Sequence, residues 1–329
     1  MTMSWNGKRV LVTGAGGFLG SHLVERLMEL GARTRALVRY RSDGSWGMLE
    51  QLARRGDVDV VAGDVCDRES VTDAMKDVEI VFHLAALIAI PYSYHTPASF
   101  VSTNVNGTLN VLQAARACGV ERLVHTSTSE VYGTAQYVPI DEAHPLQAQS
   151  PYAATKVAAD KLVESFHLSY DLPVVTVRPF NTYGPRQSAR AIVPTIITQC
   201  LAETKVSLGN LTPTRDMNYV SDTVEGFVRA AATPEAVGRV INLGSGREIS
   251  VGELAKQIAG LIGKPVDIQR DEERIRPQPS EVGRLVADNR LARRLLGWEP
   301  TVSLEEGLSM TIAWIREHLD AYRPGLYAV

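Results

Sequence analysis

The chain has 329 residues, 45% hydrophobic and 22% charged, a composition typical of a globular protein with material for about two structural units. Its net charge of −3 gives no reason to expect nucleic acid or an anionic membrane as a partner. The three cysteines lie far apart and show no metal-ligand spacing, so we expect no metal and a reducing, cytoplasmic location. The longest apolar stretch, residues 80–90, is too short to span a bilayer.

Near the start of the chain a strand pattern leads through a glycine-rich turn into a helix pattern. Residues 9–13 contain the apolar run Val10-Leu11-Val12, residues 14–20 hold glycines at 14, 17 and 20, and residues 21–30 have helical periodicity. Glycines at this spacing allow a tight turn and close approach of the backbone to a pyrophosphate, which the helix N-terminus then faces. The residues expected to bind a dinucleotide cofactor here are Gly14, Gly17, Phe18 and Leu19.

Strand and helix patterns then alternate through the first half of the chain. The expected strands are residues 34–38, 58–62, 80–84, 123–126 and 173–177, and the expected helices include residues 105–118 and 152–170. Such alternation predicts a parallel sheet with helices on both faces, that is, a Rossmann-type doubly wound α/β fold. Ligands of this fold lie beyond the C-terminal ends of the strands.

The residues just after the second strand indicate which dinucleotide is bound. An acid there would accept from a ribose 2′-hydroxyl, whereas an arginine suits a 2′-phosphate. The chain has Arg39 and no acid before Asp43, which favours NADP over NAD; the alternative is that Arg39 is a solvated surface charge. Further cofactor contacts are expected after the third and fourth strands, at Asp64, Val65, Leu84, Ala85 and Ala86.

Two stretches carry the side chains expected to do chemistry. The strand at residues 123–126 runs into hydroxyl groups and one carboxylate, as a strand does where it reaches an active-site crevice. A serine and a proline at 150–151 are good helix-start residues, which places Tyr152 and Lys156 on one helical face. A neighbouring ammonium and a cationic nicotinamide favour the phenolate, so Tyr152 is a candidate proton acceptor. The candidate catalytic residues are Thr128, Ser129, Glu130, Tyr152 and Lys156.

Beyond residue 186 the patterns become less regular, and a strand pattern at 240–244 is a candidate to rejoin the first sheet. We expect a cofactor domain of residues 1–180 plus about 238–246, and a smaller discontinuous substrate lobe of residues 181–237 and 247–329. Three arginines of this lobe are candidates for clamping a diphosphate, because a guanidinium matches phosphate bidentately. They are Arg186, Arg215 and Arg276, and the alternative is that they are solvated.

Four motifs together resemble those of a known family. They are Thr13-Gly14-x-x-Gly17-x-x-Gly20, the hydroxyl-rich strand end, Tyr152-x-x-x-Lys156, and Arg178-Pro179-x-Asn181-x-Tyr183-Gly184-Pro185. In this combination the chain resembles the extended short-chain dehydrogenase/reductases that act on nucleotide sugars. Within that group, residues 83–94 and 126–135 resemble the legionaminic-acid type of NDP-N-acetylglucosamine 4,6-dehydratase. So do Arg215-Asp216 and Arg276-Pro277 with Ser280-Glu281-Val282.

The resemblance implies a role for each residue of the crevice. Thr128 would orient the 4-hydroxyl of the sugar, Tyr152 would remove its proton, and Lys156 would hold the phenolate and the nicotinamide ribose. Glu130 would remove the proton at C5, after which water leaves from C6. Such dehydratases have Thr-Asp-Glu or Thr-Ser-Glu at the strand end, and this chain has the second form. Ser129 departs from the Thr-Asp-Glu pattern and is too weak an acid to protonate the leaving hydroxyl, so that acid is either Glu130 or water.

The resemblance also implies the partners. The substrate would be UDP- or GDP-N-acetylglucosamine, and the sequence does not identify the nucleobase. Helices 105–118 and 152–170 carry apolar residues on more than one side and would pair with their symmetry mates in a homodimer. The expected substrate contacts are Tyr94, Asn181, Arg186, Arg215, Arg276 and Glu281.

Three alternatives stay open. UDP-glucuronate decarboxylases have a similar strand end, although residues 151–156 look less like that group. A nucleotide-sugar 4-epimerase needs to rotate only a 4-keto intermediate and has no use for a carboxylate at C5. A catalytically silent, cofactor-binding regulator belongs to a different class, and it would have no need to keep Thr128, Tyr152 and Lys156 together.

Overall fold

The computed structural model describes residues 3–322 of the chain. Its centre is a seven-stranded sheet in which every pairing is parallel. The strand order reverses between β1 and β4, and a dinucleotide binds at such a switch point in this class of sheet. The order is β10 (Val240–Leu243), β6 (Val174–Pro179), β5 (Arg122–Thr126), β4 (Ile80–His83), β1 (Arg9–Thr13), β2 (Arg33–Val38) and β3 (Asp59–Ala62).

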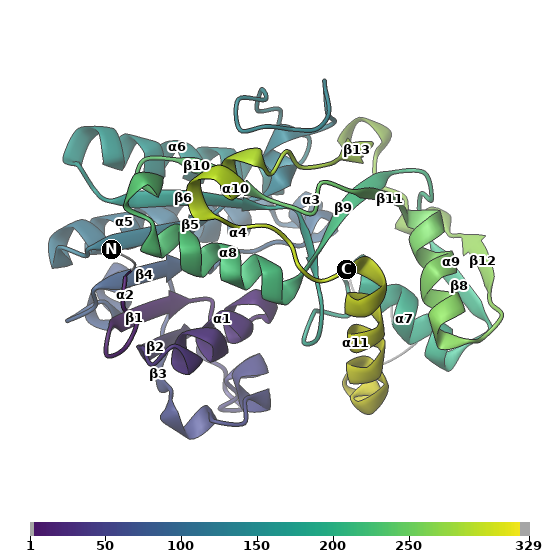
Figure 1. Ribbon diagram of the computed structural model, residues 1–329, viewed down its shortest axis with the longest axis horizontal. Coiled ribbons are helices and arrows are strands. Elements are labelled where there is room, and N and C mark those ends of the chain that lie inside the picture. Colours follow the sequence, from purple (N-terminus) through teal and green to yellow (C-terminus); the bar gives the residue numbers. More distant parts are fainter. Residues whose placement is uncertain (1–2, 323–329) are drawn as a thin grey trace.

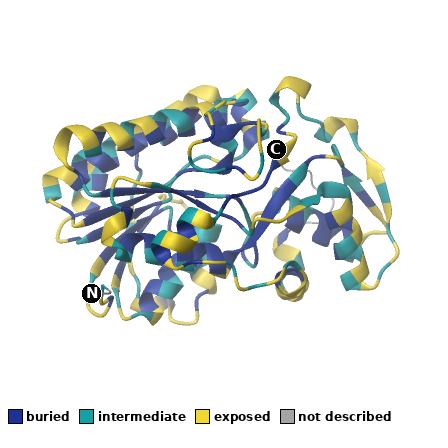
Figure 2. Ribbon diagram, turned by 45° about the horizontal axis from the view of Figure 1, so that its top comes forward, coloured by how far each residue is buried: buried dark blue, intermediate teal, exposed yellow. Residues whose placement is uncertain are grey.

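Helices cover both faces of the sheet (Figure 1). One face packs in an apolar core against α1 (Phe18–Glu29) and α8 (Val220–Ala232). The other packs in a second core against α2 (Arg68–Ala74), α5 (Gly107–Cys118) and α6 (Pro151–Tyr170). The central strands are therefore buried on both sides (Figure 2), which is why they read as continuous apolar runs. The predicted doubly wound α/β fold is confirmed.

A smaller lobe lies beside the sheet, near the label of β9 in Figure 1. β9 (Thr214–Tyr219) pairs with β7 (Asn181–Tyr183), β11 (Glu248–Ser250) and β13 (Arg284–Leu285), and β8 (Lys205–Leu208) pairs with β12 (Asp267–Arg270). The helices of the lobe are α7 (Ile192–Ala202), α9 (Val251–Ile262) and α11 (Leu304–Glu317). Its strands come from either side of β10, which joins the main sheet, so the lobe is discontinuous in sequence. The exact domain boundaries stay a prediction.

The helices that line the site begin where local chemistry dictates. α6 begins as predicted, because Ser150 Oγ accepts from the Ala153 N–H at 3.1 Å and Pro151 fills the first position. α1 begins at Phe18, three residues before the expected position, because Gly17 is its N-cap and the turn passes directly into the helix. The pattern did not predict α3 (Ile90–His95), α4 (Pro97–Phe100), the π-helical turn Val101–Asn106 or α10 (Arg290–Leu296).

Within residues 3–322, no helix has the length and apolar character that crossing a bilayer requires. In the same part of the chain, no three or more His, Cys, Asp and Glu side chains gather in an arrangement able to hold a metal ion. The cytoplasmic location stays a prediction from composition.

Candidate active site

The glycine-rich turn after β1 leaves no room for side chains at several positions, Gly14 and Gly20 among them. Gly14 has a φ of +70°, and a Cβ on it would lie 2.8 Å from the backbone nitrogen of Ala85. A Cβ on Gly20 would collide with the carbonyl oxygen of Gly14. Gly17, Phe18 and Leu19 sit between these points, where the free N–H groups of α1 begin. The turn thus has the open backbone and the helix N-terminus that a dinucleotide pyrophosphate requires.

The loop after β4 is held by buried side chains that the sequence pattern did not single out. Thr13 Oγ1 accepts from the backbone N–H groups of Leu84 and Ala85, both at 3.1 Å. His83 Nδ1 lies 2.9 Å from this hydroxyl, and its Nε2 lies 3.0 Å from Thr108 Oγ1. Because Thr108 donates its own proton to a backbone carbonyl, His83 donates through Nε2 and accepts through Nδ1. Burial holds the pKa of His83 well below its usual value, which keeps the ring neutral.

The π-helical turn before α5 places Asn104 beneath the same loop. Its Oδ1 accepts from the Leu87 N–H at 2.8 Å, and its Nδ2 donates to the Leu87 carbonyl at 2.9 Å and to Thr155 Oγ1 at 3.0 Å. Thr155 in turn donates to the Tyr152 carbonyl at 2.7 Å. Asn104 therefore joins the predicted cofactor loop to the catalytic helix. Single π turns are rare in proteins, and those that occur are often found at functional sites.

Tyr152 and Lys156 are both buried, one turn apart on α6. Burial raises the pKa of the Tyr152 phenol above its usual value, and its hydrogen bond with Thr128 works in the opposite direction. Burial lowers the pKa of Lys156 to about 8, against the attraction of the Asp160 carboxylate. Lys156 Nζ donates to the Thr126 carbonyl at 2.6 Å. The structure thus brings together the phenol, the ammonium and the threonine hydroxyl that the sequence predicted.

The residues after β5 form a short 3-10 turn, Ser129–Tyr132, that carries Glu130. Thr128 caps this turn, since its Oγ1 accepts from the Glu130 N–H at 3.2 Å. Ser129 is buried, and Glu130 is partly exposed. The Glu130 carboxylate acts electrostatically on the Tyr152 phenol and on the Arg215 guanidinium. The Glu130 carboxylate therefore lies within electrostatic range of a phenol on α6 and of a guanidinium on β9.

Arg39 and Asp64 lie together at the end predicted for the adenosine of the cofactor. Arg39 Nε is 3.8 Å from Asp64 Oδ2, and the arginine side chain is 79% exposed. Asp64 Oδ1 accepts from the Cys66 N–H at 2.9 Å, and Val65 is buried. A long, exposed ion pair costs little to exchange for a phosphate. The preference for NADP stays a prediction.

Arg215 and Arg276 of the smaller lobe share one carboxylate. Arg215 Nη2 lies 3.5 Å, and Arg276 Nη1 3.8 Å, from Glu281 Oε1. Burial lowers the pKa of Arg215, and the charge of Glu130 opposes this effect. Among the residues the structure describes, the buried atoms Arg276 Nη1 and Asn181 Oδ1 have no hydrogen-bond partner. The hydrogen-bonding capacity of Arg276 and Asn181 is therefore incompletely used, as is typical of groups that bind a ligand.

Arg186 is directed elsewhere. Its Nη2 pairs with Glu25 at 2.5 Å and its Nη1 donates to Ser21 Oγ at 3.4 Å, both on α1. His22 Nε2 lies 3.0 Å from the neighbouring Pro185 carbonyl, and burial lowers the pKa of this histidine to about 4. Arg186 thus fastens the lobe to α1, and these contacts give no support to its predicted place in a diphosphate clamp.

Residues 277–281 of the lobe are joined to the main domain beside the crevice. Tyr94 Oη, on α3, lies 2.7 Å from Ser280 Oγ. Gln149 Nε2, one residue before the cap of α6, donates to the Pro279 carbonyl at 2.9 Å. Glu281 comes next in the chain and is the carboxylate shared by the two arginines. Tyr94 on α3 and Glu281 on the lobe, two of the predicted substrate contacts, are therefore linked through Ser280.

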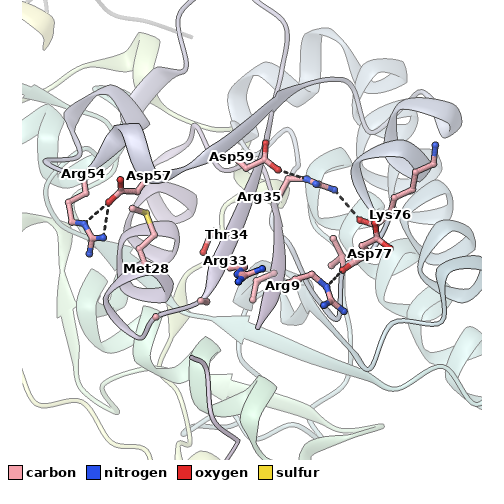
Figure 3. A pocket seen from close by; sticks show the side chains of 14 residues that line it. Arg9, Met28, Arg33, Thr34, Arg35, Arg54, Asp57, Asp59, Lys76 and Asp77 are labelled. Atoms are coloured by element: carbon pink, nitrogen blue, oxygen red, sulfur yellow. Dashed lines mark hydrogen bonds and ion pairs between the residues drawn. The ribbon is translucent and has the colours of Figure 1, made fainter. Parts of the chain in front are cut away.

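A separate hollow of about 490 Å³ lies at the N-terminal ends of β1 and β2 (Figure 3). Its charged side chains are largely paired with one another: Arg54 with Asp57 at 2.7 Å, and Arg35 with Asp59 at 2.7 Å. Ligands of a parallel α/β sheet bind at the opposite, C-terminal ends of the strands. We therefore do not assign the chemistry to this hollow.

Comparison with known proteins agrees with this geometry. The sequence pattern of the family described as GDP-mannose 4,6 dehydratase matches residues 11–311. The chain belongs to this family. Its members are extended short-chain dehydrogenase/reductases, as the motifs predicted.

Relatives in this family include both dehydratases and epimerases. A UDP-glucose 4-epimerase of Mycolicibacterium smegmatis is 38% identical over 319 residues, covering 94% of this chain and 98% of that protein. A human dTDP-D-glucose 4,6-dehydratase is 32% identical over 325 residues, covering 96% and 92%. The crystal structure of DesIV, a dTDP-glucose 4,6-dehydratase of Streptomyces venezuelae with NAD and TYD bound, has a TM-score of 0.86 at 30% identity and covers 96% of this chain and 99% of that chain.

Family membership therefore makes this chain a nucleotide-sugar enzyme of the dehydratase or epimerase kind. Both activities begin by oxidising the sugar at C4, and they differ in the steps after that oxidation. The narrower resemblance to the legionaminic-acid type of dehydratase stays a prediction.

Proposed function

We propose that the chain is an NDP-sugar 4,6-dehydratase that converts UDP- or GDP-N-acetylglucosamine into the 4-keto-6-deoxy sugar. The observation that carries this proposal is the position of Glu130, a carboxylate on the short turn that Thr128 caps and within electrostatic range of the Tyr152 phenol. Elimination of water from a 4-ketone requires a base at C5, and Glu130 supplies it. An epimerase would give this carboxylate no step to perform.

The residues present fit a nicotinamide dinucleotide. When bound, this cofactor supplies the hydride acceptor for C4 and the hydride donor for C6. Gly14 leaves the backbone open to the pyrophosphate, and the N-terminus of α1 complements its charge. The Leu84–Ala85 loop, fixed from below by Thr13, forms the wall beside the ribose.

The first step is removal of a proton from the 4-hydroxyl of the sugar. Tyr152 takes this proton as the phenolate, and Thr128, its hydrogen-bonding partner, orients the hydroxyl. Burial opposes the phenolate, so a cation beside it is required. Lys156 provides that cation one helical turn away.

The second step is loss of water across C5 and C6. The ketone at C4 acidifies the C5 hydrogen, Glu130 removes it as a proton, and the C6 hydroxyl leaves as water. The proton for this leaving group comes from Glu130 or from a water molecule, because the hydroxyl of Ser129 is too weak an acid. After hydride returns to C6 and a proton to C5, the net change is the loss of one water.

We assign the nucleotide diphosphate to Arg215 and Arg276. Guanidinium groups bind phosphate oxygens bidentately. Arg276 Nη1 has no hydrogen-bond partner among the described residues, and Arg215 Nη2 makes only a 3.5 Å contact with Glu281. Glu281 holds the pair in place before the substrate arrives. Asn181, whose Oδ1 has no partner among the described residues, and Tyr94 would complete the sugar pocket.

We further propose a homodimer through the outer faces of α5 and α6. Leu109 and Leu162 are only partly buried on these neighbouring helices, which Figure 1 shows along one side of the sheet. Leu112 and Phe166, two further apolar residues of the same helices, face the apolar core instead. A monomeric mass by light scattering at micromolar concentration would rule the dimer out.

The test of the activity is incubation of the purified protein with UDP- and GDP-N-acetylglucosamine in separate reactions, followed by mass spectrometry. Loss of the mass of one water is the expected result for one of the two. A product of unchanged mass with altered chromatographic mobility would make the chain an epimerase. Loss of carbon dioxide from UDP-glucuronate, with no reaction of the N-acetyl sugars, would make it a decarboxylase.

A 4-epimerase is the second candidate, and a specific observation favours it. The Mycolicibacterium relative with that activity is 38% identical, above the 32% of the human dehydratase. Ser129 points the same way, since a dehydratase of the Thr-Asp-Glu pattern would have a stronger acid there. The mass measurement separates the two candidates directly.

A further inference from the structure

Beneath the catalytic residues lies a buried carboxylate that the mechanism above does not use. Asp160 is one helical turn beyond Lys156 on α6 and is 5% exposed. Within the described chain it receives hydrogen bonds from three side chains: Ser127 Oγ at 2.8 Å, His125 Nε2 at 3.2 Å, and Arg178 through Nε at 3.2 Å and Nη2 at 2.9 Å. So many donors on one buried carboxylate indicate a fixed anion.

These bonds fasten the catalytic turn at both of its ends. Ser127 immediately precedes Thr128, so the bond to Asp160 anchors the turn where it leaves β5. Arg178 Nη1 donates to Tyr132 Oη at 2.9 Å, and Tyr132 is the last residue of the turn. Tyr132 Oη donates onward to Asn242 Oδ1 at 2.7 Å. The segment that presents Thr128 and Glu130 is therefore tied, through one carboxylate, to the helix that carries Tyr152 and Lys156.

The same carboxylate sets the charge of the site. The buried cations are Lys156 and Arg178, and Asp160 is the anion between them, which leaves one excess positive charge. Both buried histidines nearby are neutral: burial lowers the pKa of His125 to about 4, and that of His83 lies well below its usual value. Glu130, which is only partly exposed, adds a carboxylate that also acts on Tyr152, so the single excess positive charge counts the fully buried groups alone. Among these buried groups, a Tyr152 phenolate would neutralise that charge.

Building on the proposed function, we propose that Asp160 is a positioning residue of the C4 oxidation. Its carboxylate fixes the position of α6 relative to the two ends of the catalytic turn. It is also the negative charge that keeps Lys156 protonated beside Tyr152. It touches neither substrate nor cofactor, and it acts through Lys156, Ser127 and Arg178. Burial works to raise the pKa of Asp160, but the hydrogen bond from His125 and the charge of Arg178 outweigh burial and hold that pKa at about 2, so Asp160 stays ionised at every working pH.

The test is the pH profile of single-turnover cofactor reduction in the Asp160→Asn variant. Without the anion, Lys156 loses its proton more readily and the Tyr152 phenolate forms more readily. Both limbs of the profile should therefore move to lower pH by about one unit, the scale of one neighbouring charge. The rate at the optimum should fall about tenfold or more. A purely structural role would lower the rate equally at every pH, and that result would overturn the proposal.

The matched control is Ser127→Ala, which removes one hydrogen bond to Asp160 and keeps the charge. It should lower the rate a few-fold, the scale of one hydrogen bond, with neither limb displaced. An unchanged rate would overturn the positioning role, even if Asp160→Asn cannot be recovered folded. A thermal melt of each variant checks the fold.

A second readout needs no sugar. The affinity for NADH, followed by its fluorescence, should fall as the pH rises and Lys156 loses its proton, because Lys156 holds the nicotinamide ribose. This fall should begin at a lower pH in Asp160→Asn than in the unmutated protein. If none of the nucleotide sugars tested reduces the cofactor of the unmutated protein, the proposed function fails. The measurement of NADH affinity still decides the role of Asp160 in that case. An identical pH dependence of NADH affinity in both proteins would contradict it.

Discussion

The floor and the roof of the crevice are built differently. In the floor, formed by β5, β6 and α6, the charged groups are fixed by short bonds, as in the 2.9 Å pair of Arg178 and Asp160. In the roof, formed by the smaller lobe, Arg215 and Arg276 reach Glu281 only at 3.5 and 3.8 Å. The Arg178–Asp160 pair of the floor is therefore closely made without a ligand, whereas the arginine pairs of the roof are long.

The difference indicates a division of labour. A group that must stabilise charge during reaction works best when it is fixed before the substrate arrives, because no reorganisation is then needed. A group that binds a flexible diphosphate gains from partners that it can exchange. We therefore expect substitutions in the floor to change rate and stability, and substitutions in the roof to change affinity.

The largest effect is expected at Glu130, the one acid of the catalytic turn. Glu130→Gln keeps the size and hydrogen bonding of the side chain and removes the proton acceptor. Oxidation at C4 needs only Thr128, Tyr152 and Lys156 with the cofactor, so it should survive. The variant should accumulate reduced cofactor, seen by its near-ultraviolet absorbance, while dehydration falls by about a hundredfold or more, the usual scale for general acid–base catalysis.

Two further variants frame this result. Tyr152→Phe should fail before any cofactor is reduced, because it removes the base of the first step. Ser129→Ala should dehydrate within a few-fold of the unmutated rate, since the buried serine is not the acid. Normal dehydration by Glu130→Gln would defeat the mechanism, and an epimerase would then be the better description.

The floor could be predicted from the sequence only where local pattern was enough. Tyr152 and Lys156 were found because a capped helix fixes their spacing, and Thr128 because it closely follows a buried strand. Asn104 and Asp160 were missed, because their partners lie far away in the sequence: Asn104 bonds Leu87 through a π turn, and Asp160 bonds a residue 35 positions earlier. No local period encodes such contacts.

The roof was harder to predict for a different reason. Its strands are short, β7 with three residues and β13 with two, and such segments carry almost no alternation. The arginines were recognised by charge alone. Charge alone does not predict whether a guanidinium will bind a ligand or a neighbouring helix. Arg186 pairs with Glu25, which tertiary packing brings close to it on α1.

The next largest effect is expected in the roof, at Arg215. Arg215→Met keeps much of the side-chain volume and removes a charge-assisted contact to phosphate, worth about 1.5–3 kcal/mol. The KM for the nucleotide sugar should rise about tenfold to a hundredfold, with kcat within a few-fold. The matched control is Arg284→Met, which removes an arginine paired with the exposed Glu248 and should leave KM unchanged. A fall in kcat at constant KM in Arg215→Met would contradict the expectation that the roof determines affinity and the floor determines rate.

A smaller effect, on stability, is expected at Lys156. Its pKa is lowered by burial from 10.5 to about 8, so the folded protein holds this proton less tightly than the unfolded chain does. The cost is fully present below pH 8 and disappears as the pH rises toward 10.5. Lys156→Met should therefore abolish activity yet raise the free energy of unfolding at pH 7 by about 1–2 kcal/mol, less than the lowered pKa implies, because the bond to Thr126 is lost.

Urea unfolding at pH 7 and at pH 9.5 measures this effect. The gain from Lys156→Met should shrink at the higher pH, because the unmutated lysine is then largely neutral in the folded state. Asp160 remains as a buried anion paired with Arg178, so the variant keeps one balanced pair. If the variant is less stable than the unmutated protein at both pH values, Lys156 stabilises the fold. That result would contradict the claim that burial of this lysine costs stability.

The smallest effect is expected at Arg39, a highly exposed predicted ligand that belongs to neither floor nor roof. Its 3.8 Å pair with Asp64 is weak enough to yield to a 2′-phosphate, whereas an unphosphorylated ribose offers it no charge to bind. Arg39→Asp replaces attraction by repulsion beside an existing acid, so NADP affinity should fall about tenfold or more while NAD affinity changes little. Arg41→Asp is the matched control, because Arg41 is already paired with Asp43 at 2.9 Å and should leave the ratio of the two affinities nearly unchanged. Equal binding of NAD and NADP by the unmutated protein, measured by calorimetry, would mean that Arg39 is a surface charge and that the prediction of NADP is wrong.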